Sequence, residues 1–390
     1  MNLWLSEEQQ LLASSAEAVL AKEHDFQSRR RSGAAGDSTL WPLFAEMGWL
    51  GQPLPQATGG FGGDALGTGL LLEAMGRHLV TQPFHACMVA ARLLSGLGTS
   101  AQQQDWLPAM VEGRERLALA HEEAAFESPW AAPATRADRA GDGWVLHGRK
   151  LLVVGAPDAR ALLVTATVPR PHGGVRIFLV EPSAGGLSLM PCRTVDGLEA
   201  ADVRLDGVEL GRHALVGSDT DATAVLHRVL AEGLVGACWD ACGAMTAAYE
   251  QTVAYTRQRV QFGKPLAEFQ AVAHRLAEMA VCCTEARAAC ELASLRLERR
   301  DDEDVVVALA ATAKNKVGRC ADFIAKEAVQ LHGAIGTTEE LPISFWFRRL
   351  MAFNARGGAP EWHARFLGQR HVSGKAWRES QTLPPARVTA

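Results

Sequence analysis

A tight corner between two long helical patterns constrains the fold of this chain more than any other feature. Before the corner, apolar side chains recur every three or four residues from Val235 to Val253, which is the spacing of one buried helical face. Gly263 and Pro265 interrupt the pattern, and a second apolar series then begins at Phe269 and ends at Leu297. The sequence therefore predicts two long antiparallel helices joined near Gly263.

The corner itself is rich in polar and cationic side chains, namely Arg257, Arg259, Gln261, Lys264 and Gln270. A guanidinium pairs with phosphate oxygens through two parallel hydrogen bonds, so these residues suit a ligand phosphate. A solvated loop between two bundle helices explains the same composition, and periodicity alone favours that interpretation.

The rest of the chain divides into three regions of different periodicity, and 390 residues suffice for two or three domains. Residues 1–116 show helical spacing. Short apolar runs separated by turn dipeptides then predict the strands of a small antiparallel barrel or sandwich over 117–222. Helical spacing returns over 223–390. We therefore expect an α+β protein: an N-terminal helical domain, a middle β domain and a C-terminal four-helix bundle.

Composition excludes several classes of function. A net charge of -5 gives no reason to expect nucleic acid as a partner. No apolar run approaches the roughly 20 residues that span a bilayer, and no secretory signal is evident, so we expect a cytoplasmic protein without membrane insertion. The eight cysteines form no C-x-x-C pair, which favours buried thiols in a reducing compartment and no metal site.

The corner resembles the first FAD-binding segment of the acyl-CoA dehydrogenase family. The matching residues are Arg259, Phe262, Gly263, Pro265 and Gln270, in the order R-x-x-F-G-x-P followed by Q. In that family, the arginine, the phenylalanine and the glutamine reach across a subunit interface to the neighbour's FAD. The resemblance therefore implies FAD as cofactor and an oligomer of at least two chains.

A second segment resembles the family's other FAD motif, which usually reads Q-x-x-G-G-x-G. It begins at Gln330 and includes Gly333, Ala334 and Gly336, so Ala334 replaces the second glycine. The order of helical, β and bundle regions is also that of the family, and the resemblance extends to about Gln369. It implies the acyl-CoA dehydrogenase fold and an acyl-CoA substrate.

Four phrases narrow the resemblance to the branch that contains the small subunit of pimeloyl-CoA dehydrogenase. They span 24–30, 118–123, 141–150 and 194–210. This branch implies a dicarboxylyl-CoA substrate and electron-transfer flavoprotein as acceptor. It also implies either a homo-oligomer or a heterotetramer with a second acyl-CoA dehydrogenase-like subunit.

The positions that contact the flavin ring in the family, which we call the flavin-side positions, carry unusual residues in this sequence. His121 stands where relatives usually place threonine, and Leu152 and Val154 stand where they usually place tryptophan and a hydroxyl residue. Backbone groups, with His121, are then the expected contacts to the flavin ring. A strand histidine that a neighbour satisfies explains His121 equally well.

The largest departure from the family pattern is at the position of the catalytic carboxylate, where this sequence has glycine. The family's usual position falls on Gly358, and the isovaleryl type's position falls on Gly233. Glu361, Glu232 and Asp240 lie nearby, and the resemblance implies Glu361 as a displaced base because it requires the smallest shift. Three hypotheses follow: a self-sufficient FAD-dependent acyl-CoA dehydrogenase, a catalytically incomplete partner subunit, or the family fold without dehydrogenase activity.

Overall fold

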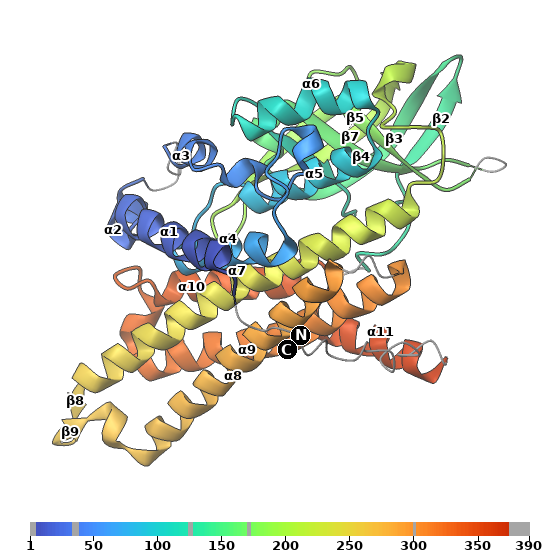
Figure 1. Cartoon of the computed structure of the whole chain (residues 1–390). Helices are drawn as coiled ribbons and strands as arrows, with labels where there is room; N and C mark the ends of the chain where they lie inside the picture. The colour runs from blue at the N-terminus through green and yellow to red at the C-terminus, as the bar shows by residue number, and fades with distance from the viewer. Residues whose placement is uncertain (1–4, 33–38, 124–127, 170–172, 299–301, 374–390) are drawn as a thin grey trace, which may run out of the picture.

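The computed structural model describes residues 5–32, 39–123, 128–169, 173–298 and 302–373. Figure 1 shows the N-terminal helices beside a curled β-sheet, with a bundle of long helices beneath both. The order of regions is the one that the sequence predicts.

The N-terminal region is helical, as expected. Its helices are α1 (Glu7–Glu23), α2 (Phe26–Ser32), α3 (Leu40–Glu46), α4 (Ala65–Arg77), α5 (Phe84–Leu97) and α6 (Ser100–Val111). A capping box begins α1: the hydroxyl of Ser6 accepts from the N–H of Gln9 at 3.2 Å, and the Gln9 side chain accepts from the N–H of Ser6 at 3.0 Å.

The middle region is one curled sheet of seven strands in the order β1-β4-β2-β3-β7-β6, with β5 paired to β4. The strands are β1 (Leu117–Ala120), β2 (Arg136–Ala140), β3 (Gly143–Val154), β4 (Ala161–Thr167), β5 (Val175–Val180), β6 (Leu187–Arg193) and β7 (Glu199–Leu210). The expected antiparallel pattern holds for most pairs. β4, however, pairs in parallel with both β1 and β2. The period of a strand shows which face is buried but not which strand lies beside it, so this difference was not visible in the sequence.

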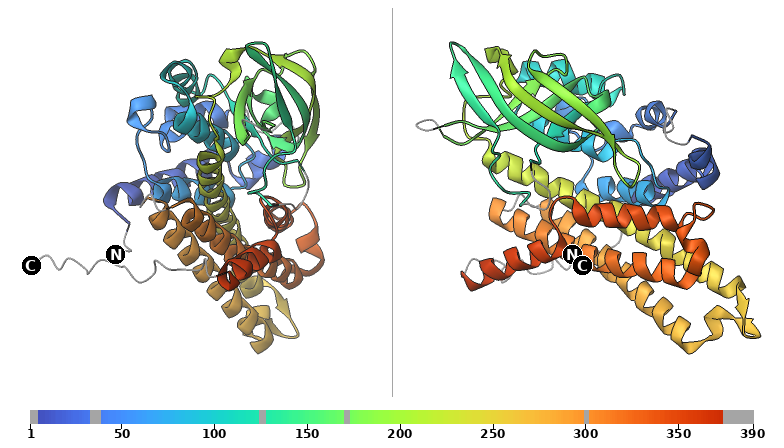
Figure 2. Two further views of the ribbon diagram at one scale, coloured as in Figure 1. Left: turned by 90° about the vertical axis from the view of Figure 1, so that its right-hand side faces the viewer. Right: turned by 180° about the vertical axis from the view of Figure 1, so that it is seen from behind.

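The C-terminal region consists of long helices. They are α7 (Thr223–Gln258), α8 (Gln270–Leu297), α9 (Glu303–His332), α10 (Ile343–Ala355) and α11 (Pro360–Val372). The predicted corner between α7 and α8 is a small hairpin of β8 (Val260–Gln261) and β9 (Lys264–Pro265). At its tip, Phe262 has φ 53° and Gly263 has φ 84°. Figures 1 and 2 show this hairpin projecting from the end of the bundle that lies farthest from the sheet.

Two glycines bring the N-terminal region into direct backbone contact with the bundle. A Cβ atom at Gly76 of α4 would lie 1.9 Å from the carbonyl oxygen of Asp240. One at Gly243 of α7 would lie 1.8 Å from that of Glu73. Any side chain at either position would therefore force α4 and α7 apart. This close crossing fixes one wall of the cavity described below.

The thiols on the apolar faces of the bundle helices are buried or half-buried. Cys238, Cys242 and Cys290 are buried, as their apolar faces predict, and Cys283 is half-buried. Within the described ranges, none of the helices combines the length and the apolar character that crossing a membrane requires.

Candidate active site

A cavity of about 260 Å³, which we call the main cavity, lies against the ends of the predicted flavin-side strands. It lies between α4, α5, the ends of β1 and β3, α7 and α10, and its wall is mostly apolar. Residues on that wall include Leu72, Met75, Phe84, Leu234 and Phe353. Apolar walls with a few polar groups are typical of a ligand site.

Two further cavities adjoin the main cavity, one larger and one smaller. A distal chamber of about 420 Å³ shares Leu72, His85, Val89 and Gly233 with it, and a side cavity of about 40 Å³ shares Glu122 and Gly357 among others. At the boundary with the distal chamber, the Nε2 atom of His85 lies 2.8 Å from the carbonyl oxygen of Gly233. Burial lowers the pKa of His85, so the ring is neutral at physiological pH.

The structure brings both of the family's base positions to this region. Gly233 and Gly357 line the main cavity, and Gly358 lines the side cavity. A Cβ atom at Gly358 would lie 2.9 Å from the Nε2 atom of His363, and the backbone there has φ 85°. A carboxylate side chain at 358 would therefore be strained. Replacing this glycine does not by itself rebuild the family's site.

The three carboxylates that the sequence suggested lie in different settings. Glu361 is exposed in the first turn of α11 and lines none of the cavities described here. Its role as a displaced base stays a prediction. Glu232 forms an ion pair with Arg92 at 3.0 Å and lines the distal chamber. Asp240 lines the main cavity, but both of its oxygens accept from Arg349, at 2.9 and 2.7 Å.

Arg349 is the centre of a buried charge cluster at the edge of the cavity. Besides Asp240, it pairs with Asp196 at 3.4 Å, and Asp196 also accepts from Arg356 at 2.7 and 3.0 Å. Although burial alone would raise the pKa of Asp196, Arg349 and Arg356 hold that pKa below its usual range. The cluster ties α10 to α7 and to the turn before β7, so it holds the loop of Gly357 in place.

His121 is buried beside the cavity and has two protein partners. Its Nε2 atom lies 3.1 Å from the carbonyl oxygen of Pro129, and its Nδ1 atom lies 3.1 Å from the hydroxyl of Thr165. Burial, and then the charge of Lys150, lower the pKa of His121 to about 4. A neutral ring that donates from Nε2 and accepts at Nδ1 satisfies both contacts. His121 also lines the main cavity, so a flavin contact stays a prediction.

Lys150 anchors the same strand end. Its buried ammonium group donates to Glu123 at 2.6 Å and to Thr165 at 2.9 Å. Burial lowers the pKa of Lys150 to about 8, although the Glu123 carboxylate acts in the opposite direction. A buried charge is tolerable only when it is paired and hydrogen-bonded, so this pair fixes the segment after β1.

The end of β3 supplies the other flavin-side positions. Val154 lines the main cavity, as does Leu152, which is 48% exposed and has φ 48°. A positive φ is costly for leucine and often marks a functional site. The N–H of Leu152 donates to Asp202 at 3.0 Å, and the pairing of β3 with β7 shifts register here. This irregularity turns the end of β3 toward the cavity.

The predicted FAD corner lies elsewhere. Arg259, Phe262 and Gln270 are exposed on the projecting hairpin and the start of α8, and none of them lines the main cavity of their own chain. Phe262 is 90% exposed, which is unusual for a large apolar side chain. This placement is what a contact to a neighbouring chain requires.

The second predicted FAD segment lies near the first. Gln330, Gly333 and Ala334 are exposed at the end of α9, where Gly333 has φ 66°. The ring of His332 stacks on Tyr255 with a centroid distance of 4.4 Å, and the Tyr255 hydroxyl donates to the carbonyl oxygen of His332 at 3.3 Å. The two motifs are thus brought together at one end of the bundle.

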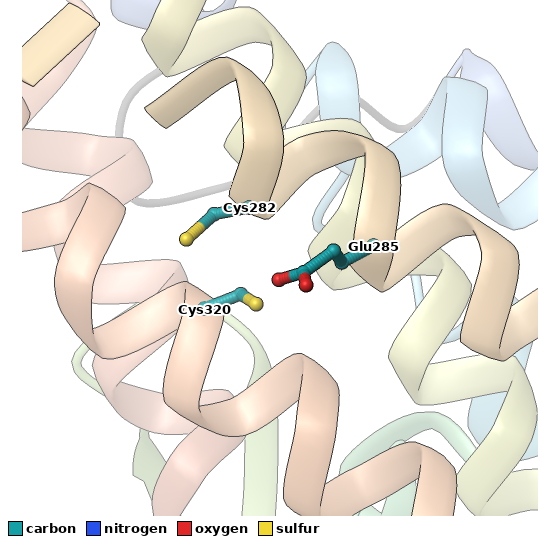
Figure 3. Close-up of side chains that lie close together, drawn as sticks. All are labelled: Cys282, Glu285 and Cys320. Atoms are coloured by element: carbon teal, nitrogen blue, oxygen red, sulfur yellow. The ribbon is translucent and has the colours of Figure 1, made fainter. Parts of the chain in front are cut away.

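A separate cluster of ligand-type side chains was not anticipated from the sequence. Cys282 and Glu285 of α8 point toward Cys320 of α9, with ligand atoms within 4.8 Å of one another (Figure 3). Glu285 already pairs with Lys316 at 2.5 Å, and burial raises the pKa of the Cys320 thiol to about 12. A cation would have to displace both a lysine and tightly held protons, so the cluster is not a ready metal site.

Comparison with known proteins identifies the family. Three family models match: the N-terminal domain of acyl-CoA dehydrogenase at residues 6–114, its middle domain at 118–208 and its C-terminal domain at 223–372. Among solved structures, the Tcur3481-Tcur3483 steroid ACAD is 31% identical with a TM-score of 0.85, over 95% of this chain and 99% of that one.

Relatives with curated names belong to the same family or are named as subunits of related enzymes. Long-chain specific acyl-CoA dehydrogenase of Rattus norvegicus mitochondria is 29% identical over 86% of this chain and 79% of its own length. The Caffeyl-CoA reductase-Etf complex subunit CarC of Acetobacterium woodii is 26% identical over 81% and 85%.

The helical, β and bundle domains, with a cavity between sheet and bundle, define a flavoprotein of the acyl-CoA dehydrogenase type. More particularly, the chain belongs to the acyl-CoA dehydrogenase family, whose cofactor is FAD. The expectation of an acyl-CoA dehydrogenase fold is thereby confirmed.

Proposed function

We propose that this chain is an FAD-dependent acyl-CoA dehydrogenase that introduces an α,β double bond into an acyl-CoA thioester. The observation that carries the proposal is the main cavity, where the ends of the two flavin-side strands meet Gly233 and Gly357. FAD accepts the β-hydride in this chemistry, and the protein supplies orientation and the base.

Two separate groups of residues have the chemistry to hold FAD. Around the main cavity, His121, Leu152 and Val154 form the wall against which a flavin ring would lie. At the projecting hairpin, exposed Arg259 offers a guanidinium for a diphosphate and exposed Phe262 offers an apolar surface. Gln270 and Gln330 add amide groups at the same end of the bundle. The second group would serve the flavin of a neighbouring chain.

The distal chamber supports a bulky or long acyl group. It continues the main cavity past His85, and its wall carries Arg92 and Arg228 together with Glu232. An acyl chain that passes His85 would place its far end beside these charges. A terminal carboxylate of a dicarboxylyl-CoA would find two guanidinium groups there, both of which already pair with Glu232. A steroid side chain would also fill such a volume, and a solved relative at 31% identity is a steroid ACAD.

A second candidate function is that of a partner subunit in a heteromeric dehydrogenase. Glycine at both of the family's base positions favours it, and so do FAD-corner residues that face away from their own cavity. Electron-transfer flavoprotein is the proposed acceptor, and a relative named as a subunit of a reductase-Etf complex supports that choice.

The test is spectroscopic. The purified chain should carry FAD, seen by absorbance at about 450 nm, and anaerobic addition of a saturated acyl-CoA should bleach it. Acyl-CoAs of increasing length, with and without a terminal carboxylate, then define the substrate. If the bound flavin never bleaches alone but does so after co-expression with a second dehydrogenase-like subunit, the partner-subunit function is the correct one.

A further inference from the structure

The main cavity holds one carboxylate without a cationic side-chain partner. Of the described residues that line it, only Glu122 and Asp240 are acidic. Both oxygens of Asp240 are bound by Arg349, so Asp240 is committed to the charge cluster. Glu122 forms none of the ion pairs found among the described residues. A general base needs a carboxylate that is free to take a proton.

The backbone holds Glu122 at the junction of the main and side cavities. It lies just after β1, and its carbonyl oxygen accepts from the N–H of Leu151 at 2.7 Å, which joins this segment to β3. The pair of Glu123 and Lys150 anchors the next residue. Glu122 and Gly357 both line both cavities, so the carboxylate faces the loop on which the family's base position falls.

The surroundings of Glu122 shift its carboxyl group toward the protonated form. Burial raises its pKa, and the N–H of Gly357 and the charges of Arg356 and Lys314 oppose this effect. The residue has exposed surface because it faces the cavities, while protein atoms surround it on the other sides. A carboxylate whose pKa is raised is a stronger base once ionised.

We propose that Glu122 is the general base that removes the α-proton of the acyl thioester in this chain, an inference that rests on the proposed function. A carboxylate oxygen of Glu122 takes the α-proton, and the electron pair of that C–H bond forms the α,β double bond. Bound FAD would accept the β-hydride and would pass its two electrons on to an electron-transfer flavoprotein. The other products are an enoyl thioester and a protonated Glu122.

A purely structural role is the competing explanation, because Glu122 also accepts from the N–H of Gly357 and would thereby position the loop. Glu122→Gln separates the two roles. The glutamine carbonyl still accepts this hydrogen bond, but a neutral amide does not take the proton. Glu361→Gln tests the rival carboxylate, and Glu46→Gln is a control on an exposed glutamate of α3.

The measurement is exchange of the α-proton with D₂O in 3-thiaacyl-CoAs, whose sulfur at the β position prevents hydride loss. Binding of each probe is followed by the change in the flavin spectrum. We expect Glu122→Gln to slow exchange by about 10²–10⁴-fold, with FAD content and melting temperature unchanged. Glu46→Gln and Glu361→Gln should exchange at the rate of the unmodified chain, and that rate should rise with pH through an apparent pKa above the usual carboxyl range.

Three results overturn the proposal: normal exchange in Glu122→Gln, loss of exchange in Glu361→Gln, or no exchange in a chain that binds the probes. A chain that binds none of the thioesters overturns it too, because its base would have no substrate. Exchange that depends on Glu122, without dehydrogenation of any acyl-CoA, would support the base and refute the proposed dehydrogenase function.

Discussion

At the scale of single residues, two buried histidines of this site have strongly lowered pKa values. His121 and His363 both have a pKa lowered to about 4, in each case chiefly by burial. His363 is fully buried, and its Nε2 atom lies 2.8 Å from the carbonyl oxygen of Gly357. The two rings flank the segments that carry Glu122 and Gly357. Both rings are therefore neutral in the folded protein at physiological pH.

These two histidines predict a pH-dependent stability. In the unfolded chain, these two histidines bind protons at about pH 6.5. In the folded chain, their rings stay neutral down to about pH 4. The free energy of unfolding should therefore be constant above about pH 7 with respect to these groups, and should fall as the pH falls. Between pH 7 and pH 5, the loss should be about 2 kcal/mol for each histidine.

Denaturant unfolding across this pH range provides the measurement. His121→Asn should lower stability at pH 7 but should also flatten the pH dependence. His274→Gln, on the exposed face of α8, should leave both unchanged. If the unmodified chain shows equal stability at pH 7 and pH 5, the two rings do not stay neutral as the structure indicates.

At the scale of elements, the sequence predicted what depends on local period. The apolar positions from Phe269 to Leu297 repeat over a full 28-residue helix, so α8 was recognisable without its neighbours. Helix α6 has only Leu107, Ala109 and Met110 buried, and its weak pattern was not recognised. The parallel pairing of β1 with β4 depends on strands far apart in the chain. For the same reason, the position of Glu122 beside Gly357 could not be predicted: no local signal reports a contact between distant segments.

The projecting hairpin leads to a prediction about flavin affinity. If Arg259 binds a diphosphate, Arg259→Ala should weaken FAD binding by about 1.5–3 kcal/mol, the value of a charge-assisted hydrogen bond. Arg259→Lys should recover only part of this, because an ammonium group makes no two-pronged contact. Arg319→Ala, which replaces an exposed arginine of α9 outside the corner, is the matched control. FAD dissociation constants test this, and equal values in all variants would mean that Arg259 has no part in the cofactor site.

At the scale of the whole molecule, a single chain places the two sets of residues proposed to bind flavin far apart. The strand ends line the main cavity, while the hairpin projects from the far end of the bundle (Figure 2). Exposed apolar side chains accompany this end, among them Val260 and Phe262 of the hairpin and Val281 of α8. Such surface is typical of an interface between chains. We therefore expect at least a dimer, with an interface on the order of 2,000 Å².

Mixed assemblies would show directly whether the hairpin acts on a neighbouring chain. Arg259→Ala damages the flavin site of the neighbour, whereas Glu122→Gln damages the chain's own cavity. In a mixed dimer, one site then combines an intact Glu122 with the partner chain's intact Arg259, and the other site carries both defects. At an FAD concentration too low to load the Arg259→Ala site, random co-expression of the two variants should therefore restore about a quarter of the unmodified turnover, as the symmetry of a closed dimer requires. Separately purified variants, mixed without exchange of chains, should stay inactive. If co-expression restores nothing while mixed dimers form, Arg259 and Glu122 serve the same chain, and the hairpin does not complete a neighbour's site.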